Sequence, residues 1–335
     1  MRQPATNPGC CSVNEELAQS AAAGGWAVSE DVAMGSSNEK WPVLPVAEWV
    51  DTRDTLQLWT QIVGKVRMVS TPLMNHWWNV PLYVTSRGLT TSLIPRDGRG
   101  FQIDLDLLAD RLDISVSDGT SASMPLASGP VAGFYAELMD RLDGLGLHTP
   151  VWTMPVEIPD AIPFDDDTTH TVYDGDQARR FWRLLIQASR VFEVFRSRYV
   201  GKVSPVHLFW GALDLAVTRF SGRVAPPHPG GAPNCGPHVM WEAYSHEVSS
   251  AGYWPGPDGE GVFYSYAYPV PDGFAAADVG IPEARYDEQL GEFVLPYEAV
   301  RTASDPDDRL LAFLQATYDL AADLATWDRA SLERS

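Results

Sequence analysis

The densest group of reactive side chains lies in the stretch EAYSHEVSSAGYWPG, residues 242 to 256. Within six positions it places two glutamates, a tyrosine and a histidine among small and aromatic residues. An imidazole beside carboxylates is suited to general acid–base catalysis, because a carboxylate orients the ring and sets its basicity. We therefore predict that His246, Glu247 and Glu242 are catalytic.

The conformation of this stretch decides which of its side chains meet. If VMWEAYSHEVSSAG is a strand, Glu242, Tyr244 and His246 share one face. If it is a helix, His238, Glu242 and His246 line one side at spacings of four, which suits a metal ion. The run of small and aromatic residues after Val248 favours the strand.

Charged residues interrupt the apolar run PVHLFWGALDLAVTRFSGR at Asp214 and Arg219. A charge in so hydrophobic a segment must be paired or functional, because an unpaired buried charge is costly. The two side chains can form a structural ion pair with each other. As functional residues, Arg219 and Asp214 would bind substrate with Trp254 and Tyr244, the arginine and the rings holding an anionic or planar group.

Three histidines could supply a divalent metal site. His207 begins the same apolar run, His228 lies in the rigid loop APPHPGG, and His246 belongs to the opening stretch. Imidazole is a common metal ligand, so these residues, with Glu247, are the metal ligands that the sequence offers. His207 can equally be a histidine of the core. No other cofactor is indicated.

Familiar catalytic motifs do not occur in the chain. It has no glycine-rich phosphate loop ending in Lys-Ser or Lys-Thr, no dinucleotide fingerprint, no His-Glu-x-x-His and no Gly-x-Ser-x-Gly. The candidate site is therefore a constellation of residues, and no reaction class or substrate follows from it.

Composition limits the partners. The chain has 335 residues, 45% of them hydrophobic and 11% aromatic, which is enough to form a substantial core. Its net charge of −20, from 44 acidic and 24 basic residues, disfavours binding to nucleic acid and to membrane surfaces. A small molecule is the expected partner, and the oligomeric state is left open.

Cellular location follows from what the chain lacks. Three cysteines, two of them adjacent near the N-terminus, provide no disulfide framework. No run approaches the roughly 18 apolar residues of a membrane helix, and the N-terminus does not read as a signal peptide. We expect a cytoplasmic protein.

Hydrophobic periodicity predicts an α+β fold in which antiparallel sheets pack against helices. Residues 1–40 are expected to be a disordered extension, and 41–330 a single domain. Helices are predicted at 46–68, 130–147, 176–200 and 305–328. Hairpins or strands are predicted at 77–94, 101–118, 149–158, 205–220, 240–252, 261–269 and 291–297.

The order of these elements suggests an internal duplication. A helix, several strands and a helix occur in residues 41–160 and again in 174–330, on either side of a connector rich in proline and aspartate. The fragments LWTQIVGKV and FWRLLIQASRV look distantly alike. We interpret the two parts as similar half-units of one domain.

The body of the chain from Trp41 onward resembles a family of uncharacterised bacterial proteins known only as a domain of unknown function. The segments that carry the resemblance are WPVLPVAEWVDTRDTLQLWTQIVGKVRM, HWWNVPLYVTSRGLTTS, WTMPVEIPDAIPFDDDTTH, SPVHLFWGALDLAVTRFSGR, APPHPGG and EAYSHEVSSAGYWPG. The resemblance implies no activity, cofactor or catalytic residue.

The sequence therefore predicts a small-molecule enzyme with a His/Glu-centred pocket in the C-terminal half, and a metal-dependent pocket is the leading variant. A non-catalytic protein that encloses a small ligand in a hydrophobic, tryptophan-lined cavity is the alternative. The same polar residues could also be a buried structural network.

Overall fold

The computed structural model describes residues 40–334, so the predicted N-terminal extension lies outside the described residues except for Lys40. The described chain is α+β, as predicted. Its helices are α3 (Val46–Ser70), η1 (Asn75–Trp77), α4 (Val131–Gly144), α5 (Gly175–Ser197), α6 (Pro237–Ala243), η2 (Phe274–Ala276), α7 (Tyr297–Arg301), α8 (Pro306–Leu324) and α9 (Arg329–Leu332). Within residues 40–334, none of these helices combines the length and the apolarity that spanning a membrane requires.

The strands of the described residues form two antiparallel sheets of six strands each. The first sheet has the order β1-β2-β4-β5-β6, with β3 also paired to β4, and the second has the order β11-β12-β10-β9-β8-β7. The strands of the first sheet are β1 (Tyr83–Val84), β2 (Gly88–Thr90), β3 (Ile94–Arg96), β4 (Arg99–Asp106), β5 (Arg111–Val116) and β6 (Ser121–Pro125). Those of the second are β7 (His207–Phe209), β8 (Asp214–Val224), β9 (His246–Trp254), β10 (Val262–Tyr268), β11 (Arg285–Asp287) and β12 (Glu292–Pro296).

Helix α3 is buried on all sides along much of its length. Every residue from Leu58 to Arg67 is buried, including the polar side chains of Gln61 and Lys65. Such a helix cannot show a clean apolar stripe, because each of its faces contacts protein. Its buried polar groups must find hydrogen-bond partners in neighbouring segments.

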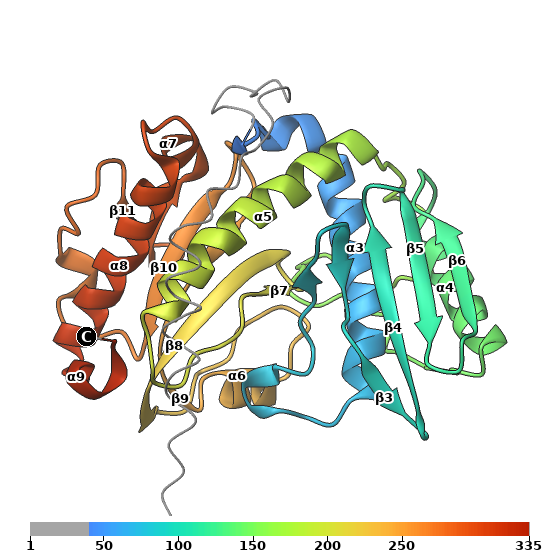
Figure 1. Ribbon diagram of the computed structural model, residues 1–335, viewed down its shortest axis with the longest axis horizontal. Helices are drawn as coiled ribbons and strands as arrows, with labels where there is room; N and C mark the ends of the chain where they lie inside the picture. Colours follow the sequence, from blue (N-terminus) through green and yellow to red (C-terminus); the bar gives the residue numbers. More distant parts are fainter. Residues whose placement is uncertain (1–39, 335) are drawn as a thin grey trace, which may run out of the picture. The chain divides into compact units, whose positions relative to one another are not determined.

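Helices α5 and α8 cover one face of the second sheet, as Figure 1 shows. Both helices begin at an aspartate cap that satisfies free backbone amides of the first turn. The Asp174 carboxylate accepts from the amides of Asp176 and Gln177, and the Asp305 carboxylate accepts from the amide of Asp308. The opposite face of this sheet is left for the cavity described below.

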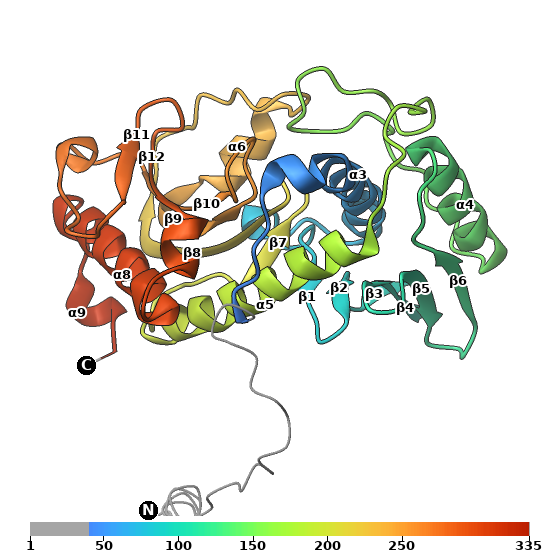
Figure 2. The same ribbon diagram turned by 90° about the horizontal axis from the view of Figure 1, so that it is seen from above.

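The two sheets meet where β1 approaches β7. An antiparallel bridge joins Leu82 to Leu208, with backbone hydrogen bonds of 3.0 and 2.8 Å. Helix α5 contacts both β1 and β8, and Figure 2 shows it running along both sheets. The sheets therefore share one set of packed helices.

Most predicted elements are present, with three differences. Residues 149–158 form no strand, because side chains of α3 take up the backbone groups of this segment. The predicted strand 205–220 is a hairpin of β7 and β8. The expected strand from residue 240 begins only at His246, after the short helix α6. The internal duplication is not confirmed.

Candidate functional site

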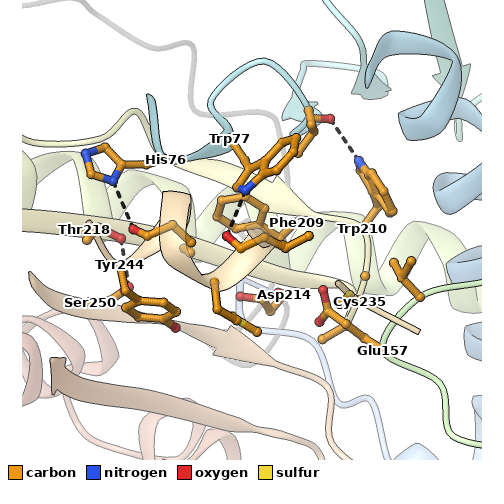
Figure 3. A pocket seen from close by; sticks show the side chains of 18 of the residues that line it. His76, Trp77, Glu157, Phe209, Trp210, Asp214, Thr218, Cys235, Tyr244 and Ser250 are labelled. Atoms are coloured by element: carbon orange, nitrogen blue, oxygen red, sulfur yellow. Dashed lines mark hydrogen bonds between the residues drawn. The ribbon is translucent and has the colours of Figure 1, made fainter. Parts of the chain in front are cut away.

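A cavity of about 730 Å³, here called the main cavity, lies on the face of the second sheet that α5 and α8 leave open. Alternate residues of β8, Asp214, Ala216 and Thr218, form part of its floor. Helix α6, the turn η1 and the connector between α4 and α5, residues 145–174, contribute to its walls. Figure 3 shows Asp214 and Glu157 near each other, with His76 and Thr218 farther along the cavity.

Asp214 is the first residue of β8 and faces the main cavity. The Tyr264 hydroxyl donates to its Oδ2 atom at 2.5 Å, which leaves Oδ1 free of that bond. Burial raises the pKa of Asp214 to about 6, although the hydrogen bond from Tyr264 acts in the opposite direction. The phenol ring of Tyr264 occupies the space beside Gly252, where a Cβ atom would lie only 2.4 Å from its hydroxyl oxygen.

Glu157 is brought to the cavity by α3. The side-chain amide of Gln61 accepts from the amide of Val156 and donates to its carbonyl, both at 2.9 Å. The backbone amide of Glu157 itself donates to the carbonyl of Pro233 at 2.8 Å. Its carboxylate lies against Gly211, where a Cβ atom would come within 2.2 Å of Oε1.

Glu157 also lines a second cavity of about 360 Å³. The residue is exposed, and it borders both cavities. Desolvation by the surrounding protein, followed by repulsion from Asp214, raises the pKa of Glu157 to about 7. Glu292, the first residue of β12, is a third carboxylate of the main cavity. Burial and repulsion from Asp214 raise its pKa to about 8.

Hydroxyl groups continue the polar surface along the sheet. The hydroxyls of Tyr244 and Tyr266 lie 2.9 Å apart, and those of Thr218 and Ser250 lie 2.8 Å apart. Burial raises the pKa of Tyr266 to about 12, so its phenol is a neutral hydrogen-bonding group. Carboxylates and hydroxyls thus share the floor of one otherwise apolar space.

Backbone strain is concentrated around the main cavity. Non-glycine residues with positive φ are rare, and they cluster at functional sites because the surrounding structure must hold them in place. Five residues that line the cavity or adjoin a lining residue have positive φ, namely His76 (56°), Trp77 (59°), Glu157 (61°), Leu213 (60°) and Asn234 (54°). Two of them set the positions of the carboxylates, since Leu213 immediately precedes Asp214.

The predicted catalytic residues make different contacts, with Glu242 and His246 beside His76 and Glu247 beside Arg223. Oε1 of Glu242 accepts from the backbone amide of His76 at 3.0 Å, whereas Oε2 of Glu247 pairs with Arg223 at 2.6 Å. His246 faces His76, with ring centroids 5.8 Å apart. Helix α6 ends at Ala243 and β9 begins at His246, so the chain changes conformation between the predicted partners. None of the three predicted residues lines the main cavity.

The predicted metal ligands are also apart. His228 stacks on Tyr244, with ring centroids 4.6 Å apart, and His246 lies beside His76. His207 is fully buried in β7, and within residues 40–334 neither of its ring nitrogens has a hydrogen-bond partner. Across residues 40–334, no three histidine, cysteine, aspartate or glutamate side chains come close enough to hold one ion.

Of the predicted substrate-binding residues, Asp214, Trp254 and Tyr244 line the main cavity, and Arg219 does not. Five positions separate Asp214 from Arg219 on one strand, so their side chains point to opposite faces. The expected ion pair between them is therefore absent. The Arg219 guanidinium lies against the rings of Phe195, Tyr318 and Tyr199, at 3.5, 4.2 and 5.1 Å from their centroids.

Sequence reasoning missed Glu157, Glu292 and Tyr264. A signal for Glu157 was present in α3, where Gln57, Gln61 and Lys65 repeat at spacings of four inside an apolar helix. Such a polar row must bind another segment, and here it binds the connector and Gly211. Glu292 and Tyr264 carry no comparable local pattern.

Comparison with known proteins identifies one family. Residues 41–334 match the model described as a family of unknown function, DUF5996. No curated protein and no solved structure matches the chain.

Proposed function

This chain belongs to the DUF5996 family, whose function is unknown, and we propose a function from the chain's own geometry. The protein is a small-molecule enzyme in which carboxyl groups of the main cavity carry out general acid–base catalysis. Asp214 acts as the base, and Glu292 and Glu157 are the groups that donate a proton.

The arrangement of Asp214 is the observation that carries the proposal. A catalytic base must reach the proton that it removes, and it must be held in one orientation. Asp214 faces a space of about 730 Å³, within the usual range for small-molecule sites. Tyr264 fixes one carboxylate oxygen, Oδ2, and among the side chains of residues 40–334 it is the donor to this carboxylate.

The protonation states of the carboxyl groups support a division of roles. With a pKa of about 6, Asp214 is mostly ionised at neutral pH, whereas Glu292, with a pKa of about 8, is mostly protonated. Two carboxyl groups whose pKa values are separated by their environment can serve as base and acid in one site. The sequence placed the acid–base role on His246, but that ring is outside the main cavity.

A general base can be tested without knowing the natural substrate. 5-Nitrobenzisoxazole is a planar molecule whose ring opens to a cyanophenolate when a base removes one proton from carbon. We expect the full-length protein to accelerate this opening at pH near 7, measured by the absorbance of the phenolate. Because a positioned base contributes about 10²- to 10⁴-fold, Asp214→Asn should lower the protein-dependent rate at least about 100-fold.

Glu247→Gln is the matched control, because the Glu247 carboxylate accepts from Arg223 and Ser221 outside the main cavity. This variant should retain the wild-type rate. Equal rates for wild type and Asp214→Asn would refute the assignment of Asp214 as a reachable base.

A second candidate function is non-catalytic binding of a small ligand. The aromatic walls of the main cavity favour it, since Trp77, Trp210 and Trp254 all contribute to them. The two functions differ in the fate of the ligand. A binding protein releases its ligand chemically unchanged, and an enzyme does not.

A further inference from the structure

The main cavity contains negative charge that no nearby cation neutralises. Asp214, Glu157 and Glu292 line it. Among the lining residues of the described chain, Lys65 alone is a lysine or an arginine. The Lys65 ammonium donates to the carbonyl of Trp152 at 2.9 Å and to that of Met154. It also lies 4.8 Å from the Trp152 ring centroid, so its charge is engaged away from the carboxylates.

The carboxylates also lack hydrogen-bond donors. In the described part of the chain, Glu157 and Glu292 accept no side-chain hydrogen bond or ion pair, and Asp214 accepts one side-chain hydrogen bond, from Tyr264. A carboxylate has capacity for several donors, and the carboxylates of Asp214 and Glu292 are partly buried, whereas that of Glu157 is exposed. An occupant that brings N–H groups would meet this unfilled capacity.

His207 lies beside the same space and adds unfilled hydrogen-bonding capacity to it. Its side chain is fully buried next to the main cavity, and within residues 40–334 neither ring nitrogen has a partner. In the register of β7 and β8, His207 pairs with Ala216 and Phe209 pairs with Asp214, so all four side chains face the cavity. Burial lowers the pKa of His207 to about 3, and the neutral ring offers one donor and one acceptor.

The residues of the cavity wall indicate which chemical groups the rest of the occupant carries. Aromatic faces attract cations and bury apolar groups, and the wall includes Trp77, Trp210 and Trp254. The sequence placed Arg219 here to hold an anion, but Arg219 lies on the other face of β8. The carboxyl groups and aromatic rings that line the cavity favour a cation.

We infer that the small molecule bound in the main cavity is an organic amine. Its protonated primary or secondary ammonium donates to the ionised carboxylate of Asp214, with the carboxyl groups of Glu157 and Glu292 as further acceptors, and its apolar body lies along the aromatic wall. The inference rests on the proposed use of this cavity for a small molecule, and it adds the charge and the class of that molecule.

Three probes that differ only in the head group test the sign of the charge. They are 2-phenylethylamine, 2-phenylethanol and phenylacetate, each titrated calorimetrically into the full-length protein at neutral pH. We expect the amine to bind at least about ten-fold more tightly than the alcohol, because a hydrogen bond to an ionised partner is roughly twice as strong as a neutral one. Phenylacetate should not bind detectably.

Variants assign the preference to the carboxylates. Asp214→Asn should reduce the ratio of amine to alcohol affinity toward one while the alcohol still binds, which shows that the cavity remains intact. Glu292→Gln should reduce the ratio less than Asp214→Asn does, because Glu292 is mostly protonated at neutral pH. Glu247→Gln, outside the cavity, should leave it unchanged.

Equal binding of amine and alcohol, tighter binding of phenylacetate, or no binding of the amine would each overturn the inference. These outcomes are distinct from failure of the proposed catalysis. Ring opening of 5-nitrobenzisoxazole that depends on Asp214, without a preference for the amine, would retain the enzyme and reject this substrate class. Preference for the amine without ring opening would retain the amine as the bound class and reject the proposed catalysis.

Discussion

Replacing Asp214 by asparagine should change how the stability of the protein depends on pH. Burial raises the pKa of Asp214 from 3.8 to about 6, so ionising this carboxyl group is harder in the folded state than in the unfolded chain. Asparagine has a similar shape and does not titrate. It can still accept the hydrogen bond from Tyr264, so the main change is the removal of the charge.

The sign follows from proton binding. Below about pH 4 the carboxyl group is protonated in both states and contributes no pH dependence. Between about pH 4 and pH 6 it ionises in the unfolded chain but remains protonated in the folded protein, so stability falls as pH rises. Above about pH 6 the full penalty is present, and a pKa rise from 3.8 to about 6 corresponds to about 3 kcal/mol.

Urea unfolding at a series of pH values measures this effect. The difference in unfolding free energy, Asp214→Asn minus wild type, should rise by about 2.5 kcal/mol between about pH 4 and pH 7. Other groups titrate in both proteins and largely cancel, apart from Glu157 and Glu292, whose repulsion from Asp214 disappears together with the charge.

Asp307→Asn is the matched control, because ion pairs have the opposite effect on that carboxyl group. Hydrogen bonds from Arg190 and Lys40 lower the pKa of Asp307 to about 2. The stabilisation of the fold by ionised Asp307 is present above about pH 3.8 and is lost as pH falls toward about 2. The difference for this variant should therefore be constant from about pH 4 to pH 7. A constant difference for Asp214→Asn as well would refute the account of Asp214 as an uncompensated buried acid.

Further substitutions test the parts that position this carboxylate. Tyr264→Phe removes the hydrogen bond that lowers the pKa of Asp214, so the midpoint of the Asp214-dependent ring-opening rate should move to higher pH; a fixed midpoint would contradict the contact. Gly252→Ala places a Cβ atom 2.4 Å from the Leu215 carbonyl and the Tyr264 ring, and should both destabilise the fold and lower that rate. Arg219→Ala should cost about 2–4 kcal/mol of unfolding free energy from lost packing, with the rate per folded molecule unchanged. Loss of rate in fully folded Arg219→Ala would place this residue in the site.

The fold could be predicted largely from local patterns. Long periodic segments gave the four main helices, and alternation gave the hairpin of β4 and β5. The segment 149–158 resembles a strand because it carries alternating apolar residues, but its backbone groups bind Gln61 and Lys65 of a helix far away in sequence. Tertiary contacts of this kind override a short local pattern, and one sequence does not reveal them.

The candidate site was less predictable, because its residues come from separate segments. Asp214 was identified because it interrupts an apolar run, and Tyr244 and Trp254 because they belong to the stretch of reactive and aromatic residues from 242 to 256. Glu157 and Glu292 lie near the ends of segments predicted as strands, where a single glutamate carries no sign of a site. They become cavity residues only when the connector and β12 are placed over the second sheet.

The spacing of charges on β8 explains why the cavity has no counter-ion of its own. Asp214 and Arg219 are an odd number of positions apart, so strand alternation directs them to opposite faces. Arg219 is held by aromatic rings and donates to the carbonyl of Phe195, which leaves it unable to neutralise a carboxylate. At an even spacing the two side chains would share the cavity face, and the guanidinium would offset part of the negative charge there. The same strand therefore supplies a stabilised cation to the core and an uncompensated carboxylate to the cavity, and only the carboxylate is free to do chemistry.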